Sequence, residues 1–150
     1  MKKIILITIT ILFAIATNAQ IKDFEKLAVK KTWKLDVEAM KPLLLLRLSF
    51  VPQMKDLSEK DKNITIEAIL KTLENMLYEF DENGIFKVSF VGLEKNNYSG
   101  TYMLDSNLNE LALTSVAQTQ KYIIKSITNE EMQLTSISNK LDFILINKKP

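Results

Sequence analysis

The sequence predicts a mainly β protein: an eight-stranded antiparallel up-and-down barrel with an N-terminal helix and a two-helix excursion between strands 1 and 2. Three observations support this prediction. From residue 78 onward apolar and polar residues alternate in short runs, turn-forming residues separate the runs, and the connections are short. Short connections imply antiparallel neighbours, and a twisted sheet of eight strands in 150 residues loses its exposed edges by closing.

The first residues have the layout of a cleavable secretory signal. Lys2 and Lys3 form a basic start, an apolar run follows over residues 4–16, and a cut is expected after Ala19. We therefore expect a signal peptide at residues 1–19 and one barrel domain at residues 20–150, in the periplasm or outside the cell. An uncleaved anchor is the alternative, although the run is shorter than the roughly 20 apolar residues that span a bilayer.

Charge and cysteine content limit the classes of partner. The chain has 20 basic and 18 acidic residues, and removal of Lys2 and Lys3 leaves 18 of each, so the mature chain is formally neutral. A neutral exported chain gives no electrostatic reason to expect nucleic acid as a partner. The absence of cysteine excludes disulfides and a cysteine-linked lipid anchor. No other segment is long enough to span a membrane, so we expect a soluble product after export.

The first two elements follow directly after the signal. Apolar residues at Ile21, Phe24, Leu27 and Ala28 lie on one stripe of a short helix over residues 21–31. Residues 32–37 then alternate between apolar and polar side chains, which predicts the first strand.

Two helices are expected next. Leucines favour helix over residues 43–51, with Pro42 in the first turn and Pro52 ending the helix. Ser58 is the expected N-cap of a second, amphipathic helix whose apolar face runs to Met76 and Leu77. The connection between strands one and two is thus expected over residues 38–77.

The remaining residues predict seven strands. A hairpin turns at residues 81–84, with Asn83 and Gly84 expected to supply positive backbone angles. A second hairpin turns at residues 105–109, and three further strands are expected near residues 121–128, 132–136 and 141–147.

This order of elements resembles the lipocalin-like domains of exported bacterial proteins over nearly the whole mature chain. The residues that carry the resemblance are "TWKLD", "YEFDENGIFKV", "YSGTYMLD" and "NEEMQLTS". Trp33 stands where lipocalins have the tryptophan of Gly-x-Trp, with Lys31 in place of the glycine. The resemblance implies that a basic residue stacks on Trp33, for which Lys148 and Lys149 are the candidates. It also implies that the first connection lies over the open end of the barrel.

An eight-stranded barrel is either filled by its own side chains or hollow enough for one small ligand, and the sequence leaves both open. The residues expected to point inward are Trp33, Leu35, Tyr78, Phe80, Phe86, Val88, Phe90, Tyr102, Leu104, Leu111, Leu113, Ile124, Leu134, Phe143 and Leu145.

The segment over residues 43–51 is too apolar to face water and too short to span a membrane. We expect it to cap the barrel as a lid or plug, and the alternative is a docking site for another chain or a membrane surface. Arg47, the only arginine, either reaches solvent or a local carboxylate, or faces the cavity and holds the anionic group of an amphiphile. The candidate ligand-binding residues are Arg47, Leu44, Leu48, Trp33, Phe86, Val88 and Tyr102.

Catalysis has little support in the sequence. The chain has no histidine and no cysteine, which removes the usual nucleophile and general-base constellations and the common transition-metal ligands. We nominate no catalytic residue, metal site or cofactor, and expect no enzyme.

Two functional hypotheses follow. The first is an exported binding protein that holds a small apolar or amphipathic molecule in the barrel under a helical lid. The second is an envelope accessory or protein-interaction module with a solid barrel, whose excursion docks a partner protein or a second copy of the chain.

Overall fold

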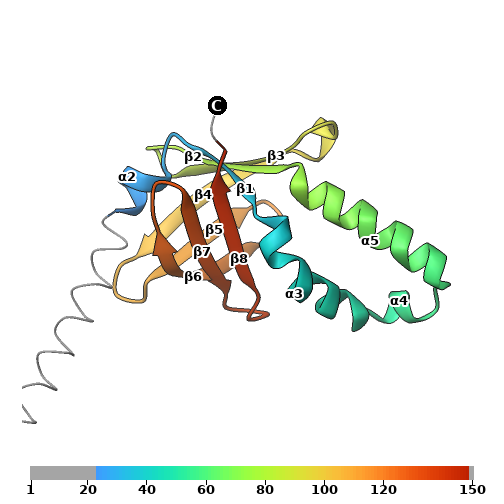
Figure 1. Ribbon diagram of the computed structural model, residues 1–150. Helices are drawn as coiled ribbons and strands as arrows, with labels where there is room; N and C mark the ends of the chain where they lie inside the picture. Colours follow the sequence, from blue (N-terminus) through green and yellow to red (C-terminus); the bar gives the residue numbers. More distant parts are fainter. Residues whose placement is uncertain (1–22, 149–150) are drawn as a thin grey trace, which may run out of the picture.

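The computed structural model describes residues 23–148 (Figure 1). The predicted signal peptide therefore lies outside the described residues. The helical elements are α2 (Phe24–Ala28), α3 (Val37–Ser49), α4 (Pro52–Lys55), α5 (Glu59–Glu74) and the short 3-10 helix η1 (Glu94–Asn96). The strands are β1 (Thr32–Leu35), β2 (Met76–Phe80), β3 (Ile85–Phe90), β4 (Tyr98–Asp105), β5 (Glu110–Ser115), β6 (Thr119–Ile127), β7 (Glu131–Ser136) and β8 (Asp142–Asn147).

The eight strands form a closed barrel in sequence order. Every strand is antiparallel to both neighbours, and β1 closes the barrel by pairing with β8, where Trp33 lies opposite Asn147 and Leu35 opposite Leu145. The predicted fold class is confirmed. Within the described residues no helix is both long and apolar enough to cross a bilayer.

The inward face of the barrel has the predicted residues. Phe80 pairs with Phe86, Tyr102 with Leu113, and Leu134 with Phe143, so the members of the predicted set meet on one face of the sheet. A register shift between Ile124 and Ser126 in β6 keeps the next inward position, Ile127, on the buried side, opposite Met132.

One end of the barrel is closed by α2. Phe24 is fully buried, with its ring 5.3 Å from that of Phe80 and 5.7 Å from that of Tyr102. Trp33 is also fully buried, and its indole Nε1 donates a hydrogen bond of 3.0 Å to the carbonyl of Ala28 at the end of α2. We call this end, with α2 as its plug, the closed end.

The helical excursion begins earlier than predicted. Asp36 caps α3 by accepting a hydrogen bond of 3.0 Å from the amide of Ala39, so Pro42 lies inside the helix and not in its first turn. The prediction of a start near residue 43 was wrong because the Asp36 cap initiates the helix as soon as β1 ends. Pro42 then costs α3 one hydrogen bond to the carbonyl four residues before it.

The second long helix starts where predicted and ends sooner. Ser58 caps α5 by accepting from the amide of Asp61 at 3.2 Å. The helix ends at Glu74, and Met76 and Leu77 belong to β2. Their apolar side chains fit the helical period, but pairing with β3 decides their conformation, with Met76 opposite Phe90.

The first hairpin turns as predicted at residues 81–84. The Asp81 carboxylate accepts hydrogen bonds of 2.9 Å from the amides of Asn83 and Ile85, and Gly84 has a φ of 76°. The expectation of a positive φ at Asn83 was wrong, because Gly84 alone supplies it here.

The helices α3, α4 and α5 form an arm that extends away from the barrel (Figure 1). We call residues 37–74 the helical arm. Only its base is packed on the barrel, where Val37 and Met40 are buried and Leu44, Leu70 and Leu73 contact the core.

Candidate functional site

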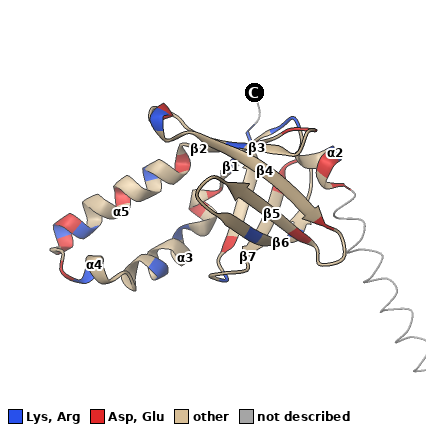
Figure 2. Cartoon of the chain, turned by 180° about the vertical axis from the view of Figure 1, so that it is seen from behind, with Lys and Arg blue, Asp and Glu red and all other residues tan. Residues whose placement is uncertain are grey.

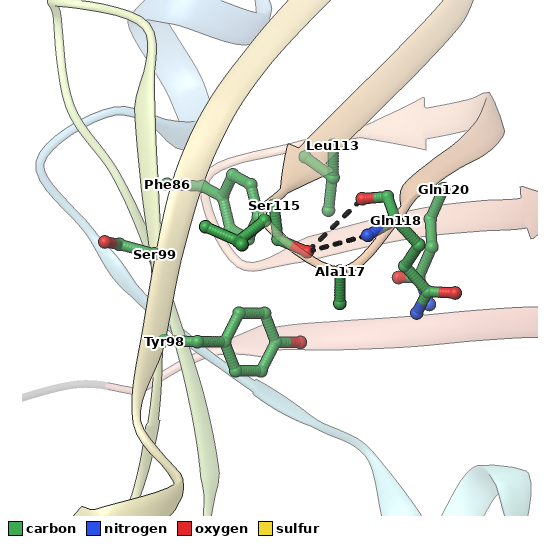
Figure 3. Close-up of a pocket in the computed structure, with 9 residues that line it drawn as sticks. Phe86, Tyr98, Ser99, Leu113, Ser115, Ala117, Gln118 and Gln120 are labelled. Carbon is green, nitrogen blue, oxygen red and sulfur yellow. Dashed lines mark hydrogen bonds between the residues drawn. The ribbon is translucent and has the colours of Figure 1, made fainter.

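The end of the barrel opposite α2 is its open end. Four connections surround it: the helical arm between β1 and β2, the β3–β4 connection containing η1, the tight turn at residues 116–118 between β5 and β6, and the β7–β8 turn at residues 137–141. A pocket of about 380 Å3 lies at this end (Figure 3). We call it the mouth pocket, and the residues that line it are Phe86, Tyr98, Ser99, Leu113, Ser115, Val116, Ala117, Gln118 and Gln120.

Aromatic and apolar side chains form the inner wall of the mouth pocket. The register places Phe86 opposite Gly100 and Leu113 opposite Gln120, which directs both apolar side chains into the barrel. Tyr98 stands across the pocket from the turn at residues 116–118, with its ring 6.2 Å from that of Phe86 in an edge-to-face arrangement (Figure 3).

Polar groups form the rim. The Ser115 hydroxyl donates to the Gln118 carbonyl at 3.2 Å and accepts from the Gln118 amide at 3.4 Å, which fixes the tight turn (Figure 3). On the next strand the Tyr122 hydroxyl donates to Gln120 Oε1 at 2.9 Å. This bond leaves the Gln120 amide nitrogen as a hydrogen-bond donor near the pocket.

Three tyrosines lie around the open end. Burial raises the pKa of Tyr78 and of Tyr98, and burial together with the charge that Tyr98 would carry raises the pKa of Tyr122 from 10 to about 12. All three phenols are therefore neutral across the physiological range. They can donate and accept hydrogen bonds, and they are poor bases and nucleophiles at neutral pH.

Below the mouth pocket the barrel is filled. The interior void measures about 20 Å3, enough for about one water molecule. Beside this void the rings of Tyr122 and Phe143 pack edge to face, with their centres 5.6 Å apart. The void is lined by Leu35, Tyr78, Phe80, Leu113, Tyr122, Leu134, Phe143 and Leu145. A ligand therefore has room at the open end and not in the depth of the barrel.

The lining of the mouth pocket carries no formal charge in the part of the chain that the structure describes. Alternation along the strands directs the nearest lysines outward: Lys87 follows the inward Phe86, and Lys121 follows the inward Gln120. Lys121 instead approaches the outward Glu110 at 3.5 Å.

The predicted ligand-binding residues do not form one site. Phe86 lines the mouth pocket, whereas Val88 is buried in the barrel wall. Trp33 and Tyr102 belong to the closed end, where the Tyr102 hydroxyl donates to the Asp81 carbonyl at 2.7 Å.

The predicted residues of the arm lie outside the mouth pocket. Leu44 and Leu48 are half-buried, and Arg47 is exposed, with its guanidinium donating to the Asn139 carbonyl at 2.9 Å. No residue of the arm lines the mouth pocket or the interior void, so the expected lid or plug is not what the structure shows.

The cation near Trp33 also differs from the expected one. Lys31 Nζ lies 5.8 Å from the centre of the Trp33 ring and donates to Asn129 Oδ1 at 2.8 Å. The predicted candidate Lys148 instead pairs through its backbone amide with the Thr32 carbonyl, and Lys149 is outside the described residues. The residue in place of the expected glycine thus provides the cation.

Tyr98, Ser115, Gln118 and Gln120 line the pocket but were not predicted as site residues. Ser115 and Gln120 carried a usable signal, because each is a polar residue at an inward position of an alternating strand. Among residues 23–148 no three acidic side chains gather closely enough to hold a metal ion.

Comparison with known proteins supports the architecture. No protein-family model matches the chain, and no curated protein matches it. The chain is similar to a DUF4847 family protein from Bacteroides vulgatus ATCC 8482, whose crystal structure aligns with a TM-score of 0.52 at 12% identity, covering 83% of this chain and 96% of that one. At this identity the similarity concerns the fold alone.

Proposed function

We propose that this protein is an exported lipocalin-like binding protein that holds a small uncharged molecule at the open end of its barrel. The observation that carries the proposal is the composition of the mouth pocket. Apolar Phe86 and Leu113 form its inner wall, while Tyr98, Ser115 and Gln120 place hydrogen-bonding groups above them. An apolar wall with a few fixed polar groups is typical of small-molecule sites.

The lining argues for a particular ligand chemistry. A pocket of about 380 Å3 is at the small end of ligand sites, which range over about 300–1,000 Å3. A lining without charge offers nothing to offset the desolvation of an ionised ligand. The ligand we propose therefore has an apolar or aromatic part that packs on Tyr98 and Phe86, and hydroxyl or carbonyl groups that bond to Gln120.

This proposal revises the first sequence hypothesis. The ligand lies at the open end and not deep in the barrel, and the helical arm does not cover it. Neutral phenols and a lining without acids or bases support binding without catalysis. Export to the periplasm or the extracellular space stays part of the proposal and is supported by the N-terminal sequence.

The test uses protein expressed with its own leader and purified without detergent. Its N-terminus is read by mass spectrometry, and binding is measured with the uncharged dye N-phenyl-1-naphthylamine and with an anionic fatty-acid dye. We expect the uncharged dye to bind more tightly. Tyr98→Ala should weaken it about tenfold or more, since truncating a central aromatic contact costs more than about 1 kcal/mol.

Thr101→Ala is the matched control, because Thr101 is exposed on the outer face of the same strand. It should leave the affinity unchanged. Failure of both dyes to bind, or equal binding by the wild type and Tyr98→Ala, would contradict the proposed site.

The second candidate function is a protein-interaction module. The specific observations in its favour are the filled interior and the exposed apolar side chains Leu46 and Phe50 on the arm. Both properties belong to the second sequence hypothesis, and neither depends on a ligand at the open end.

A further inference from the structure

The helix α3 has apolar residues on every side, together with Glu38, Lys41 and Arg47, yet only one side of it is covered. Val37 and Met40 are buried and Leu44 packs on the core, whereas Leu46 is 55% exposed and Phe50, at the C-cap, is 70% exposed. A helix that is apolar all round is normally buried all round. The outer side of α3 therefore lacks its covering surface in the single chain.

The exposed residues form one continuous face. Helical spacing places Glu38, Pro42, Leu45, Leu46 and Ser49 on the same side of α3, and each of them is exposed. The Ser49 hydroxyl donates to the Leu46 carbonyl at 2.6 Å, so it adds little free polarity. We call these five residues, with Phe50, the α3 face.

Arg47 does not interrupt this face. Its position in the helix lies away from Leu45 and Ser49, and its guanidinium bonds to the Asn139 carbonyl in the β7–β8 turn. The centre of the α3 face is therefore free of charge, and burying it would not desolvate the guanidinium.

The other helix of the arm is also incompletely covered. None of the 16 residues of α5, all within the described chain, is fully buried, and Ile64 is 55% exposed. An amphipathic helix of this length normally buries its apolar side in its own domain. Leu70 and Leu73 of α5 pack against the core, so on this helix the exposed apolar surface is at Ile64, nearer its N-terminus.

Charge along the arm is balanced in sign, and two ion pairs form within it: Lys41 Nζ lies 3.9 Å from Glu38 Oε1, and Lys62 Nζ lies 2.7 Å from Glu59 Oε1. Figure 2 shows both signs distributed over α3, α4 and α5. The basic residues are Lys41, Arg47, Lys55, Lys60, Lys62 and Lys71, and the acidic residues are Glu38, Asp56, Glu59, Asp61, Glu67 and Glu74. With six of each sign, the arm has no net charge to attract an anionic lipid surface or a strongly charged protein.

We propose that the α3 face docks on the same face of a second copy of this chain, with the two helices antiparallel about a twofold axis. Glu38 lies at the start of α3, and Lys55 lies at the end of α4, which follows α3 after a break at Val51; both residues are exposed. Antiparallel pairing centred on Leu46 buries this residue of both copies at the axis. It also directs the start of α3 in each copy, with Glu38, toward the end of the other copy's α3, beyond which α4 carries Lys55.

A twofold pair requires a surface complementary to itself, and this arrangement provides one. Apolar side chains meet in the middle and opposite charges meet at both ends, while the antiparallel helix dipoles also attract. Ala39 and Pro42, which are small and exposed, allow the two helices to approach closely. The dimer is independent of the mouth pocket, since no residue of the arm lines that pocket.

The first test measures mass in solution. The full chain, expressed with its own leader, is examined by analytical ultracentrifugation from the micromolar range to hundreds of micromolar. We expect a reversible dimer, and Leu46→Glu with Phe50→Glu should weaken it by at least about thirtyfold, because the change removes two apolar anchors and places unpaired carboxylates at the interface centre. The matched control is Met103→Glu on β4, which removes a similarly exposed apolar side chain, 73% exposed, from a different surface.

A charge-reversal cycle tests the orientation. Glu38→Lys and Lys55→Glu should each weaken the dimer about threefold or more, and the double variant should restore the wild-type constant. Circular dichroism checks that every variant is folded. A chain that is monomeric at all concentrations, or a dimer unaffected by Leu46→Glu with Phe50→Glu, would overturn the proposal.

The remaining outcomes are equally decisive. Single reversals that weaken the dimer without rescue in the double variant would overturn the antiparallel arrangement. A monomer that binds neutral lipid vesicles or another protein through the α3 face would assign that face to a different occupant. Dye binding at the mouth pocket is measured separately, so the two proposals can fail independently.

Discussion

Replacing Gly100 by alanine tests how β4 and β5 fit around the wall of the mouth pocket. A Cβ at this position would overlap the carbonyl oxygen of Thr114 and would lie 2.8 Å from Cε1 of Phe86. The Phe86 ring can rotate away, but the Thr114 carbonyl belongs to the backbone of the paired strand β5, opposite Thr101. Relief of the first contact therefore requires β4 and β5 to separate.

The contact distances set the expected magnitude. Overpacking a well-packed site costs about 1–3 kcal/mol and occasionally more. We expect Gly100→Ala to reach the upper end, about 3 kcal/mol, because the closer of the two contacts is with backbone. For a chain of this size that corresponds to a fall in Tm of about 10 °C. Urea unfolding followed by circular dichroism gives the free energy of unfolding, and a thermal scan gives Tm.

Two comparisons show whether the backbone contact is the cause. Thr101→Ala changes the next residue of β4, whose side chain is exposed, and should cost less than about 0.5 kcal/mol. Phe86→Leu combined with Gly100→Ala should be no more stable than Gly100→Ala alone, because it relieves only the ring contact. A loss below about 1 kcal/mol in Gly100→Ala, or a recovery in the double variant, would refute this reasoning.

Two further predictions concern the closed end and the tyrosines. Phe24→Ala should lower the free energy of unfolding in urea by about 3–5 kcal/mol, because the Phe24 ring is fully buried against Phe80 and Tyr102. Glu25 is exposed on the same helix, so Glu25→Ala should leave the free energy of unfolding nearly unchanged. Stability should also fall as pH rises from 10 toward 12, because the unfolded chain ionises Tyr122 first, near pH 10, whereas the folded chain keeps the phenol protonated until about 12. Tyr122→Phe should flatten that part of the curve, and an unchanged slope would contradict the stated burial of the phenol.

The barrel could be predicted because its strands and turns are specified by residues that are close together in the sequence. Alternation assigns each strand residue to one face, and turns such as the one closed by Gly84 limit where the chain can reverse. Once β2 to β8 are assigned as successive neighbours, β8 can pair with β1, because eight strands are enough to close a barrel and closure removes both exposed edges of the sheet. The inward positions, including Phe86 and Leu113, follow from the same period of two.

The errors occurred where local patterns compete. Pro42 suits the first turn of a helix, but the Asp36 side chain caps α3, which begins at Val37, six residues before the expected start at residue 43. Met76 and Leu77 continue the apolar period of α5, yet they are in β2 because they pair with β3. Both errors lie at element boundaries, where a single hydrogen-bonded cap or ladder outweighs propensity.

The position of the arm depends on tertiary contacts that alternation does not describe. The sequence required residues 43–51 to pack on something, and a lid over the barrel was the expected answer. Below the mouth pocket the interior is instead filled by inward residues such as Phe143 and Tyr122, and no side chain of the arm enters the mouth pocket itself. Arg47 bonds to the Asn139 carbonyl, 92 positions away in sequence, which no local pattern specifies.

Polarity along the barrel axis explains why both proposed binding regions belong to the open end. The closed end is sealed by Phe24 and by the fully buried Trp33, whose only polar group is bonded to the Ala28 carbonyl. At the open end, inward positions become polar at Ser115 and Gln120, and polar side chains there can exchange water for a ligand. The arm leaves from this end because β1 runs toward it and β2 returns from it. Since the barrel closes by strand pairing that excludes residues 37–74, the arm can present apolar surface to a partner without weakening the core.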